Sequence, residues 1–568
     1  MIELLFYSYL TSIHIYICGY IFCYNIIDKN IHKKSSIFEI FFYGSFILCF
    51  ITLILNFFIS LNKPVNTIIF LLPFVLFLFL FNKNYLKKIL FFSLPIAILF
   101  CLTIAYDGTY RPDAGSYHLP YISIINEHKI LIGINNIHFR FGHTSVIQYL
   151  SSIYNNFLFG EKGIIIPTGL IYCNFIFYCI YEIFHKNNNN ILKVLIFLIL
   201  TFTLFRVNRY SDFGNDAPTN LLFFYLIIES LKNNEFFLKI KKTIFASTFI
   251  FLNKITLLLG FFIPVCLIFN KFKLNYLFNK VSIISILFIF LYSGKNILVS
   301  GCLMFPVEQT CIKKLFWYDS NSDRASNAIN ARLENESWTK GWMNQETEKK
   351  EYREYLKNFG WVKTWINSEG RTIQKKIAPY LIFIIILYIF ALIFEKRTKF
   401  NSKNSFKLNN EYYICLIISF LGSLLWFLKF PVFRYGYGYL ISFFSILLLF
   451  HLKNFKIISN SVKLKKTFKY IIILLILGVV TKNVTRIYKK SEIVSNIWPN
   501  IYGSEKNFQK KENLKIYKNG EIIFYISKNG ECYYSKSPCT HFFNGKDFNI
   551  DEINVKKVFR YSIYYFDK

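Results

Sequence analysis

Long apolar stretches recur throughout this 568-residue chain, and they constrain its fold more than any other feature. About 20 consecutive apolar residues are enough to carry a helix across the hydrocarbon core of a bilayer. Such runs recur about 14 times, with three short ones at 218–231, 242–253 and 256–270. The other predicted segments lie at 4–26, 37–60, 66–81, 88–105, 163–184, 191–206, 280–296, 378–395, 411–429, 434–451 and 468–484.

The composition fits a membrane protein and excludes an ordinary soluble enzyme. Hydrophobic residues make up 54% of the chain and charged residues 17%, against about 25% charged in an average soluble protein. A soluble chain of this length would divide into several domains, each needing a polar surface that this sequence cannot supply. The sequence therefore predicts an all-α polytopic membrane protein with about 14 transmembrane segments.

The formal net charge of +33 would by itself suggest a nucleic-acid partner, so the positions of the basic residues matter. One alternate set of short connections carries 26 basic residues, and the opposite short connections hold few. Because cytoplasmic loops are enriched in basic residues, this asymmetry predicts both termini outside and no nucleic-acid partner. The lysine-rich, predicted cytoplasmic connections are 29–34, 83–88, 186–193, 232–242, 271–280, 396–407 and 453–469.

Cysteine usage gives an independent indication of sidedness. Four of the twelve cysteines lie outside the apolar runs, as the pairs Cys302 with Cys311 and Cys532 with Cys539, both on the predicted outer side. Closely spaced pairs in an oxidising compartment favour disulfides. The alternative is two pairs of free thiols. A zinc site is disfavoured, because only His541 lies close to Cys539.

The long polar segments divide the chain and gather on the predicted outer side. The first outer loop, 106–162, has apolar spacing for one or two helices along the membrane surface. The C-terminal segment contains EIIFYIS and KVFRYSIYYF, which are typical of strands in a small disulfide-stapled α+β domain. The predicted units are 1–87 with three N-terminal transmembrane helices, 88–296 as the transmembrane core, 297–377 as an extracytoplasmic loop domain, 378–484 as C-terminal transmembrane helices, and 485–568 as an extracytoplasmic domain.

The predicted cytoplasmic loops are short and contain neither a P-loop nor a dinucleotide-binding glycine motif. ATP-driven transport and direct use of a cytoplasmic nucleotide sugar are therefore disfavoured. We expect any chemistry to take place outside, on substrates that were activated beforehand and carried across the membrane.

Two aspartates and their neighbours stand out in the first outer loop. Asp107 and Asp113 follow the end of an apolar run, and Tyr117 and His118 come just after. A carboxylate in a partly dry site at the membrane surface can act as a general base. The structural alternative is a helix N-cap or a solvated loop aspartate.

The run GINNIHFRFGHTS brings Asn136, His138 and Arg140 close together. This density of amide, imidazole and guanidinium groups suits hydrogen bonding to a polyhydroxyl ligand. The alternative interpretation is the polar face of an amphipathic segment.

Three further charged residues lie at the ends of apolar runs. Asp216 occupies a position where it could cap a helix. Lys254 lies at the hinge between two short apolar segments, where it must be paired or reach the interface. Arg434 opens a span on the predicted outer side, where its guanidinium could hold a phosphate or pair with one of the aspartates. Together, carboxylates and cations beside a lipid-facing groove suit the transfer of a sugar from a lipid phosphate.

These features resemble the GT-C type membrane glycosyltransferases, which include protein O-mannosyltransferases and aminoarabinose transferases. The matching features are an Asp in the first outer loop, paired short helices with a hinge lysine (FLNKITLLL), an Arg-Tyr opening a late span (FRYGYGYL) and a terminal outer domain. A narrower resemblance, to an uncharacterised family of large bacterial membrane proteins, is carried by DAGSYHLP, GINNIHFRFG, NILVSGCLMFP and GECYYSKSPCT. It covers roughly 90–568, with the first three spans as an addition before a GT-C-like core at 88–296.

The resemblance implies a polyprenyl-phosphate-linked sugar as donor and an active site on the outer face of the bacterial inner (cytoplasmic) membrane. It implies that Asp113 is the base, with His118 orienting it or the substrate, and that Arg434 and Lys254 neutralise the departing phosphate. This chain has Asp113-Ala114 where better-known relatives often have Asp-Glu. That difference keeps Asp107 open as an alternative base, and it leaves open whether a divalent metal ion takes part; the sequence establishes no cofactor.

Three other functions fit parts of the pattern. A lipid-linked oligosaccharide flippase would suit the number of spans, but it should place polar residues at mid-membrane and show inverted repeats, which are not visible here. A polysaccharide polymerase or ligase would use the same donor chemistry with another acceptor. A non-enzymatic envelope assembly factor would tolerate the loss of Asp113. The sugar, the acceptor and the oligomeric state do not follow from the sequence.

Overall fold

The computed structural model describes most of the chain, and the fold below concerns those residues. They are 1–27, 35–108, 113–143, 145–206, 213–271, 274–345, 349–396, 408–452, 461–499, 501, 514–519, 522–527, 531–540 and 552–567. Parts of the lysine-rich connections (28–34, 397–407 and 453–460), and His541, lie outside them.

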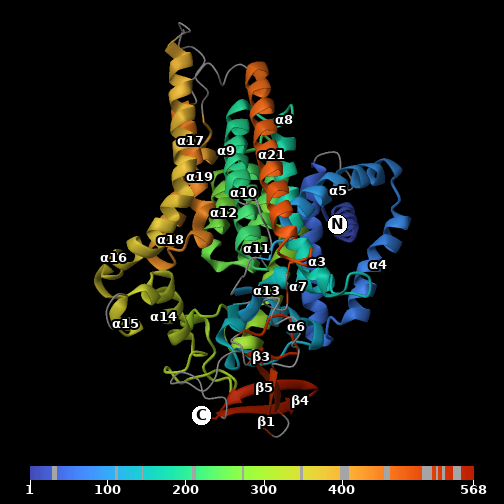
Figure 1. Ribbon diagram of the computed structural model, residues 1–568, viewed down its shortest axis with the longest axis vertical. Helices are drawn as coiled ribbons and strands as arrows, with labels where there is room; N and C mark the ends of the chain where they lie inside the picture. The colour runs from blue at the N-terminus through green and yellow to red at the C-terminus, as the bar shows by residue number, and fades with distance from the viewer. Residues whose placement is uncertain are drawn as a thin grey trace.

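Long helices run along the long axis of the molecule, and a small strand region lies at one end (Figure 1). In the first half of the chain the helices are α1 (Ile2–Phe22), α3 (Ile37–Phe58), α4 (Lys63–Phe79), α5 (Lys83–Ile104), α6 (Leu119–Glu127), α7 (Val146–Ile153), α8 (Ile166–Phe184), α9 (Asn190–Arg206), α10 (Asp216–Leu231), α11 (Phe236–Asn253), α12 (Phe262–Lys271) and α13 (Lys280–Ser300). In the second half they are α14 (Ala328–Thr339), α15 (Tyr352–Tyr355), α16 (Trp361–Trp365), α17 (Arg371–Lys396), α18 (Asn410–Lys429), α19 (Phe433–Leu452) and α21 (Ser461–Ser491).

Every predicted apolar stretch is helical, but not every helix is long and apolar enough to be identified as a candidate membrane span. Within the described residues, nine helices are long and apolar enough to cross a membrane, and three more apolar helices, at 63–79, 190–205 and 255–271, are shorter. The two remaining stretches correspond to α10 and α11, which carry charged side chains. The prediction of a polytopic helical membrane protein is therefore confirmed in outline, whereas the number of about 14 spans is not.

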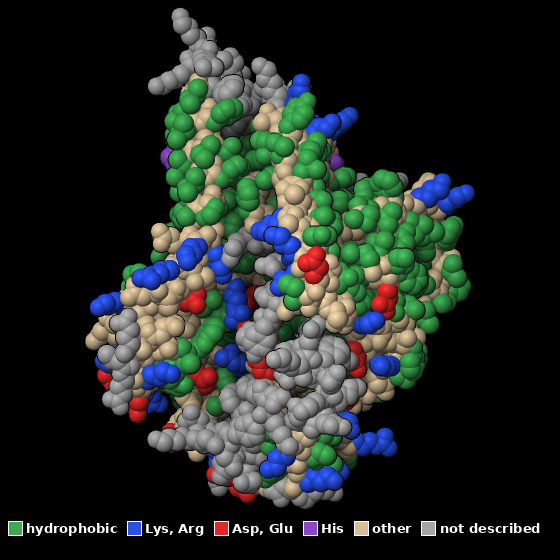
Figure 2. Space-filling model, viewed as in Figure 1, with side chains coloured by type: hydrophobic (Ala, Val, Ile, Leu, Met, Phe, Trp, Pro, Cys, Tyr) green, Lys and Arg blue, Asp and Glu red, His purple; other side chains and the backbone are tan. Residues whose placement is uncertain are grey.

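A broad apolar surface covers the helical part of the molecule. Figure 2 shows hydrophobic side chains over α4, α5, α17 and α21. Charged side chains are more frequent in the half of the molecule that carries the strand region. Phe79 on α4 and Phe290 on α13 are 82% and 72% exposed. Contiguous apolar surface of this extent is unusual for a monomer in water, and it is the surface that a lipid environment would cover.

Close backbone contact joins the first two helices. A Cβ atom at Gly19 of α1 would lie 2.0 Å from the carbonyl oxygen of Ile40 in α3, and one at Gly44 of α3 would lie 1.9 Å from that of Ile15 in α1. Only glycine permits this approach, and small residues at helix interfaces are typical of packing within membranes.

A buried cluster of charged side chains joins four helices at the lysine-rich end of the bundle. Lys232 of α10 lies 2.8 Å from Glu182 of α8 and 3.2 Å from Glu39 of α3, and it also pairs with Glu229. Lys242 of α11 pairs with Glu39 and lies 3.3 Å from Glu229. All five side chains are nearly inaccessible to solvent, so this ion-pair cluster fixes the relative positions of the four helices.

One or two surface helices were predicted in NEHKILIGINNIHFRFGHTSVIQYL, but the α-helices of the first outer loop are α6, which lies almost wholly before this stretch, and α7, which begins near its end. Neither lies along a membrane surface. Every residue of α7 and eight of the nine residues of α6 are buried. Protein therefore surrounds both helices, and the apolar spacing of this loop reflects packing on several sides.

The outer loop after α13 carries the first predicted disulfide, between Cys302 and Cys311, which confirms that pairing. One or two helices were expected around WTKGWMNQETEKKEYREYLKNFGWVKTWI. Instead this stretch is divided among α14, α15 and α16, because α14 ends before Gly341, whose φ of 89° suits only glycine well, and Asn358 and Phe359 also have positive φ.

The described part of the C-terminal segment, predicted as a small α+β domain, is a strand region. Its antiparallel pair β1 (Leu514–Asn519) and β2 (Ile522–Ser527) continues into the short parallel strand β3 (Cys539–Thr540). The second predicted strand is instead part of a hairpin, β4 (Ile553–Val558) and β5 (Tyr561–Phe566), which turns at two positive-φ residues, Phe559 and Arg560. Among the described residues after α21, no α-helix is present. The predicted disulfide between Cys532 and Cys539 is confirmed.

The strand region packs on the first outer loop. The Tyr564 N–H of β5 donates to the Ile132 carbonyl at 2.8 Å, and the Ser562 carbonyl accepts from the Ile132 N–H at 3.1 Å. Near the second disulfide, the backbone N–H groups of Cys532 and Tyr533 both donate to the Gly115 carbonyl, at 3.1 and 2.8 Å. The strand region therefore supports the loop that carries Asp113.

Candidate active site

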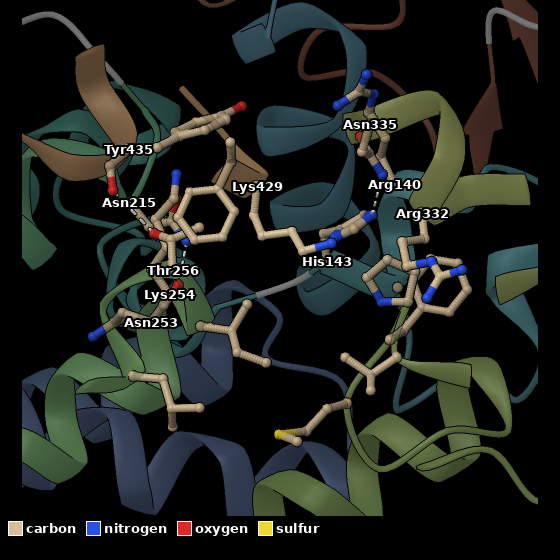
Figure 3. Close-up of a pocket in the computed structure, with 18 of the residues that line it drawn as sticks. Arg140, His143, Asn215, Asn253, Lys254, Thr256, Arg332, Asn335, Lys429 and Tyr435 are labelled. Carbon is tan, nitrogen blue, oxygen red and sulfur yellow. Dashed lines mark hydrogen bonds between the residues drawn. The ribbon is translucent and has the colours of Figure 1, made fainter. Parts of the chain in front are cut away.

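A cavity of about 470 Å³ opens at the end of the bundle that carries the outer loops (Figure 3). Its walls come from the first outer loop, the hinge after α11, the outer end of α13, α14 and the connection between α18 and α19. The volume lies in the range of pockets that hold small ligands. Phe251, Leu258, Phe305 and Leu425 give it apolar surface, and charged groups occupy its ends.

Arg434 lies at the centre of the ion pairs beside this cavity. Its Nη2 atom is 2.5 Å from Oδ2 of Asp113, and its Nε atom is 3.3 Å from Oδ2 of Asp216. The sequence allowed either a phosphate site or an ion pair with an aspartate, and the structure has the ion pair. Asp113, from the first outer loop, and Asp216, from α10, thus meet at one guanidinium although they are far apart in the chain.

Local packing explains why Arg434 reaches this point. The Asn220 side chain of α10 donates to the Arg434 carbonyl at 2.9 Å and accepts from the Gly438 N–H at 2.7 Å, which fixes the first turn of α19 against α10. A Cβ atom at Gly438 would lie 2.8 Å from Asn220, and one at Gly436 would lie 2.2 Å from the Trp426 ring. The FRYGYGYL pattern therefore places the arginine because its glycines permit close helix contact.

Lys254 lies at the predicted hinge. α11 ends at Asn253, and a 3-10 helix at Ile255–Phe261 leads into α12, so the hinge position is confirmed. The Lys254 ammonium pairs with Asp216 and lies 3.7 Å from the centre of the Tyr435 ring. Asp216 starts α10 without capping it, because its carboxylate is directed to the two cations instead.

Side-chain hydrogen bonds hold the hinge in place. Asn253 accepts from the Ile147 backbone N–H at 3.0 Å, and its carbonyl accepts from the side chain of Asn215. Thr256 donates to the Tyr435 carbonyl at 3.2 Å. These bonds join α7, α10, α11 and α19, so the position of Lys254 depends on four helices.

The charge state of Asp113 follows from its neighbours. Burial on its own would raise the pKa of this carboxyl. The positive charges of Arg434, His118 and Arg140, together with the hydrogen bond from Arg434, outweigh burial and lower the pKa below its usual value. Asp113 is therefore a carboxylate at neutral pH.

Tyr117 and His118 lie on the helical turn Ala114–His118 that follows Asp113, and both line the cavity. The Arg140 guanidinium lies 5.4 Å from the centre of the Tyr117 ring. The His118 ring contacts the Gln148 side chain, with 3.4 Å between Nδ1 and Nε2. Of the predicted residues, Tyr117, His118, Arg140, Asp216 and Lys254 line the cavity, and Asp113 and Arg434 are paired at its edge.

Three predicted binding residues do not line this cavity. Asp107 is buried at the end of α5. Asn136 donates to the carbonyls of Trp317 and Tyr564, at 3.0 and 2.9 Å, and so ties the first outer loop to its covering segments. The His138 ring accepts from the Arg140 backbone N–H at 3.1 Å, so it shapes the turn that carries Arg140.

Sequence reasoning missed two residues of the far wall of the cavity, Arg332 and Asn335 of α14. They line it together with His143, which belongs to the GINNIHFRFGHTS run singled out in the sequence (Figure 3). Asn335 and His143 are in contact at 3.1 Å. Burial, followed by the positive charges of Arg140 and Lys254, lowers the pKa of His143 to about 3, so this ring is neutral at ordinary pH.

The clearest metal-like arrangement lies elsewhere. Within the described residues, the carboxylates of Glu39, Glu182 and Glu229 are close enough to share one ion, but they already surround Lys232 and Lys242. At the cavity, Asp113 and Asp216 are paired with Arg434 and Lys254. Cationic side chains thus occupy the position beside both aspartates.

A family model described as "Domain of unknown function (DUF8201)" matches residues 1–441, which include every residue of the cavity. No curated protein and no solved structure matches this chain.

Proposed function

We propose that this chain, which belongs to the DUF8201 family of unknown function, is an integral membrane glycosyltransferase that takes its sugar from a polyprenyl-phosphate donor. The observation that carries the proposal is the meeting of Asp113, Asp216, Lys254 and Arg434 beside one cavity. The proposed reaction uses a carboxylate as base, cations to hold a phosphate and an apolar surface for a prenyl chain, and this site offers all three.

In this proposal the cations hold the donor phosphate. An arginine can bind a phosphate through two parallel hydrogen bonds, and Lys254 adds a second positive charge nearby. Leu258, Leu425 and Phe430 line the same cavity and offer apolar contacts to a prenyl chain. As the glycosidic bond breaks, negative charge builds on the phosphate, so fixed cations stabilise the transition state more than the ground state.

Asp113 is the proposed base for inverting transfer. It takes the proton of an acceptor hydroxyl while that oxygen attacks the anomeric carbon from the side opposite the phosphate. In the described state its carboxylate is held by Arg434. A phosphate that binds Arg434 displaces Asp113 and removes the main charge that lowers its pKa, so donor binding frees the base and makes it more basic.

The proposed location is the bacterial inner membrane, with the cavity and both termini on the extracytoplasmic side. Glu3, close to the N-terminus, pairs with Lys162 before α8 at 2.9 Å and accepts from Trp498, just after α21, at 3.1 Å. These contacts hold the N-terminal residues beside the segments that precede α8 and follow α21, which this proposal assigns to the extracytoplasmic side. The lysine-rich connections are then assigned to the cytoplasmic side, in line with the positive-inside rule.

The test is transfer by purified protein with Asp113→Asn. We expect this change to abolish sugar transfer from a panel of polyprenyl-phosphate hexoses, because an amide cannot accept the hydroxyl proton. The matched control is Asp323→Asn, an exposed aspartate of the outer loop that does not line the cavity. Transfer at the wild-type rate by a folded Asp113→Asn protein would rule out this assignment.

A further inference from the structure

The cavity has a second positive region that the donor phosphate does not use. Arg140 of the first outer loop and Arg332 of α14 lie together on one wall, while Lys254 and Tyr435 lie on the facing side (Figure 3). Arg332 is exposed and Arg140 is half-buried, so both can be reached from the cavity.

The acidic groups around the cavity are already paired with other cations. Asp113 and Asp216 contact Arg434, and Asp216 also contacts Lys254. Glu336, the remaining carboxylate on the lining, lies 2.7 Å from Lys340 and 3.6 Å from Lys429.

No carboxylate of the described residues forms an ion pair with Arg140 or Arg332. Arg140 is supported by ring faces instead, at 5.4 Å from the centre of Tyr117 and 5.0 Å from that of Phe139. Such contacts offset only part of the cost of removing a guanidinium from water. The carboxylates that act on these arginines at longer range are Asp113 for Arg140 and Glu308 for Arg332, and they are themselves paired with Arg434 and Lys313. This wall therefore keeps a net positive charge.

The positive charge of this wall also affects the pKa of His143. Positive charge from Arg140 adds to burial in keeping the His143 ring neutral. A neutral imidazole beside Asn335 cannot repel a cation or neutralise an anion, but it can hydrogen-bond to a sugar hydroxyl. This wall therefore combines the guanidinium groups of Arg140 and Arg332 with the neutral side chains of His143 and Asn335.

We propose that Arg140 and Arg332 form a second anion subsite, which holds an acidic group, phosphate or carboxylate, on the acceptor of the transferred sugar. This inference rests on the proposed function, since it assigns the donor phosphate to Lys254 and Arg434. Arg140 lies close enough to Asp113 to affect the charge state of its carboxyl. An acceptor whose acidic group binds Arg140 therefore has its hydroxyls near the base.

The subsite can be tested by binding to the full-length protein in lipid nanodiscs. The probes are glucose 6-phosphate, glucuronate and uncharged glucose, each titrated with and without saturating farnesyl monophosphate. We expect at least one acidic sugar to bind about tenfold more tightly than glucose, because charge-assisted hydrogen bonds are the stronger ones. The preference between phosphate and carboxylate identifies the acidic group.

Single variants locate the binding. Arg140→Gln and Arg332→Gln should each weaken the acidic sugar about tenfold and change farnesyl monophosphate binding less than twofold. The matched control is Arg353→Gln, an exposed arginine of α15 in the same outer segment that does not line the cavity. It should leave both affinities unchanged. Thermal unfolding of each variant checks that it folds.

Three results would overturn the inference: acidic sugars that bind no better than glucose, acidic-sugar binding that both variants leave unchanged, or variants that weaken farnesyl monophosphate but not the acidic sugars. The last result would assign the wall to the donor phosphate. Failure of the proposed function looks different. Farnesyl monophosphate would then bind weakly and equally to wild type and Arg434→Gln, whatever the acidic sugars do.

Discussion

At the scale of single residues, the site depends on the geometry of Arg434. Its guanidinium contacts Asp113 through one nitrogen and Asp216 through another. A planar fork can make two such contacts at once, whereas an ammonium acts as a point charge. The same fork is what a departing phosphate would use.

We expect Arg434→Gln to reduce transfer by about 10²–10³-fold, on the scale of a lost transition-state hydrogen-bond donor. Arg434→Lys should retain part of the activity, with a loss of about tenfold, because the charge remains but the fork does not. Steady-state rates with a polyprenyl-phosphate hexose measure both effects, with Arg353→Lys as control. Equal rates for Arg434→Lys and wild type would show that the fork plays no part in transfer.

The charged residues that pair beside the cavity could be found in the sequence, because a charged side chain at the end of an apolar run needs a partner. Asp216, Lys254 and Arg434 were noticed for that reason, and they do meet. Arg332 and Asn335 could not be found in the same way. They lie in AINARLENESWT, where polar residues are ordinary, and only the fold brings this helix beside the first outer loop.

At the scale of elements, apolar runs predict helices well because the signal is local. The hairpin of β4 and β5 was missed because its turn, Phe559-Arg560, has none of the residues that usually mark a turn. The burial of α6 and α7 was missed because it depends on distant segments of the chain. The region around the second disulfide covers α6, whereas α7 packs among α3, α4 and α8.

The ion-pair cluster of Lys232, Lys242 and three glutamates makes a prediction at this scale. Lys232→Met leaves buried carboxylates without one of their two cations, and we expect a loss of about 3–5 kcal/mol in stability. Thermal unfolding in detergent measures it. Lys313→Met, which removes an exposed pair with Glu308, should leave the unfolding temperature nearly unchanged, because water already screens this pair. If the two variants unfold at the same temperature, the cluster does not hold the four helices together.

At the scale of the whole molecule, the strand region and the first outer loop form one structure although the helical bundle separates them in the chain. Tyr534 donates to Asn126 of α6 at 3.0 Å, and Ser537 donates to Glu127 through both its N–H and its hydroxyl. The disulfide of Cys532 and Cys539 encloses these contacts. The loop that carries Asp113 therefore depends on a staple outside the bundle.

We expect Cys532→Ser to cost the strand region about 2–3 kcal/mol, the chain-entropy value for a short closed loop. Limited proteolysis should then cut this region faster while the helical bundle stays intact, and a non-reducing gel should show the lost cross-link. Cys266→Ser, at a free cysteine of α12, is the control. Unchanged proteolysis of Cys532→Ser would mean that the packing against α6 suffices without the disulfide.

The pairing of Asn136 with Tyr564 also sets an order of events during synthesis. The two residues are 428 positions apart, and a ribosome adding about 5–20 residues per second needs about 20–90 seconds to make the intervening chain. In the proposed orientation, the loop that carries the proposed base is therefore exported before its cover has been made. Under the proposed function, a nascent chain then begins transfer only after its final hairpin has been translated and exported.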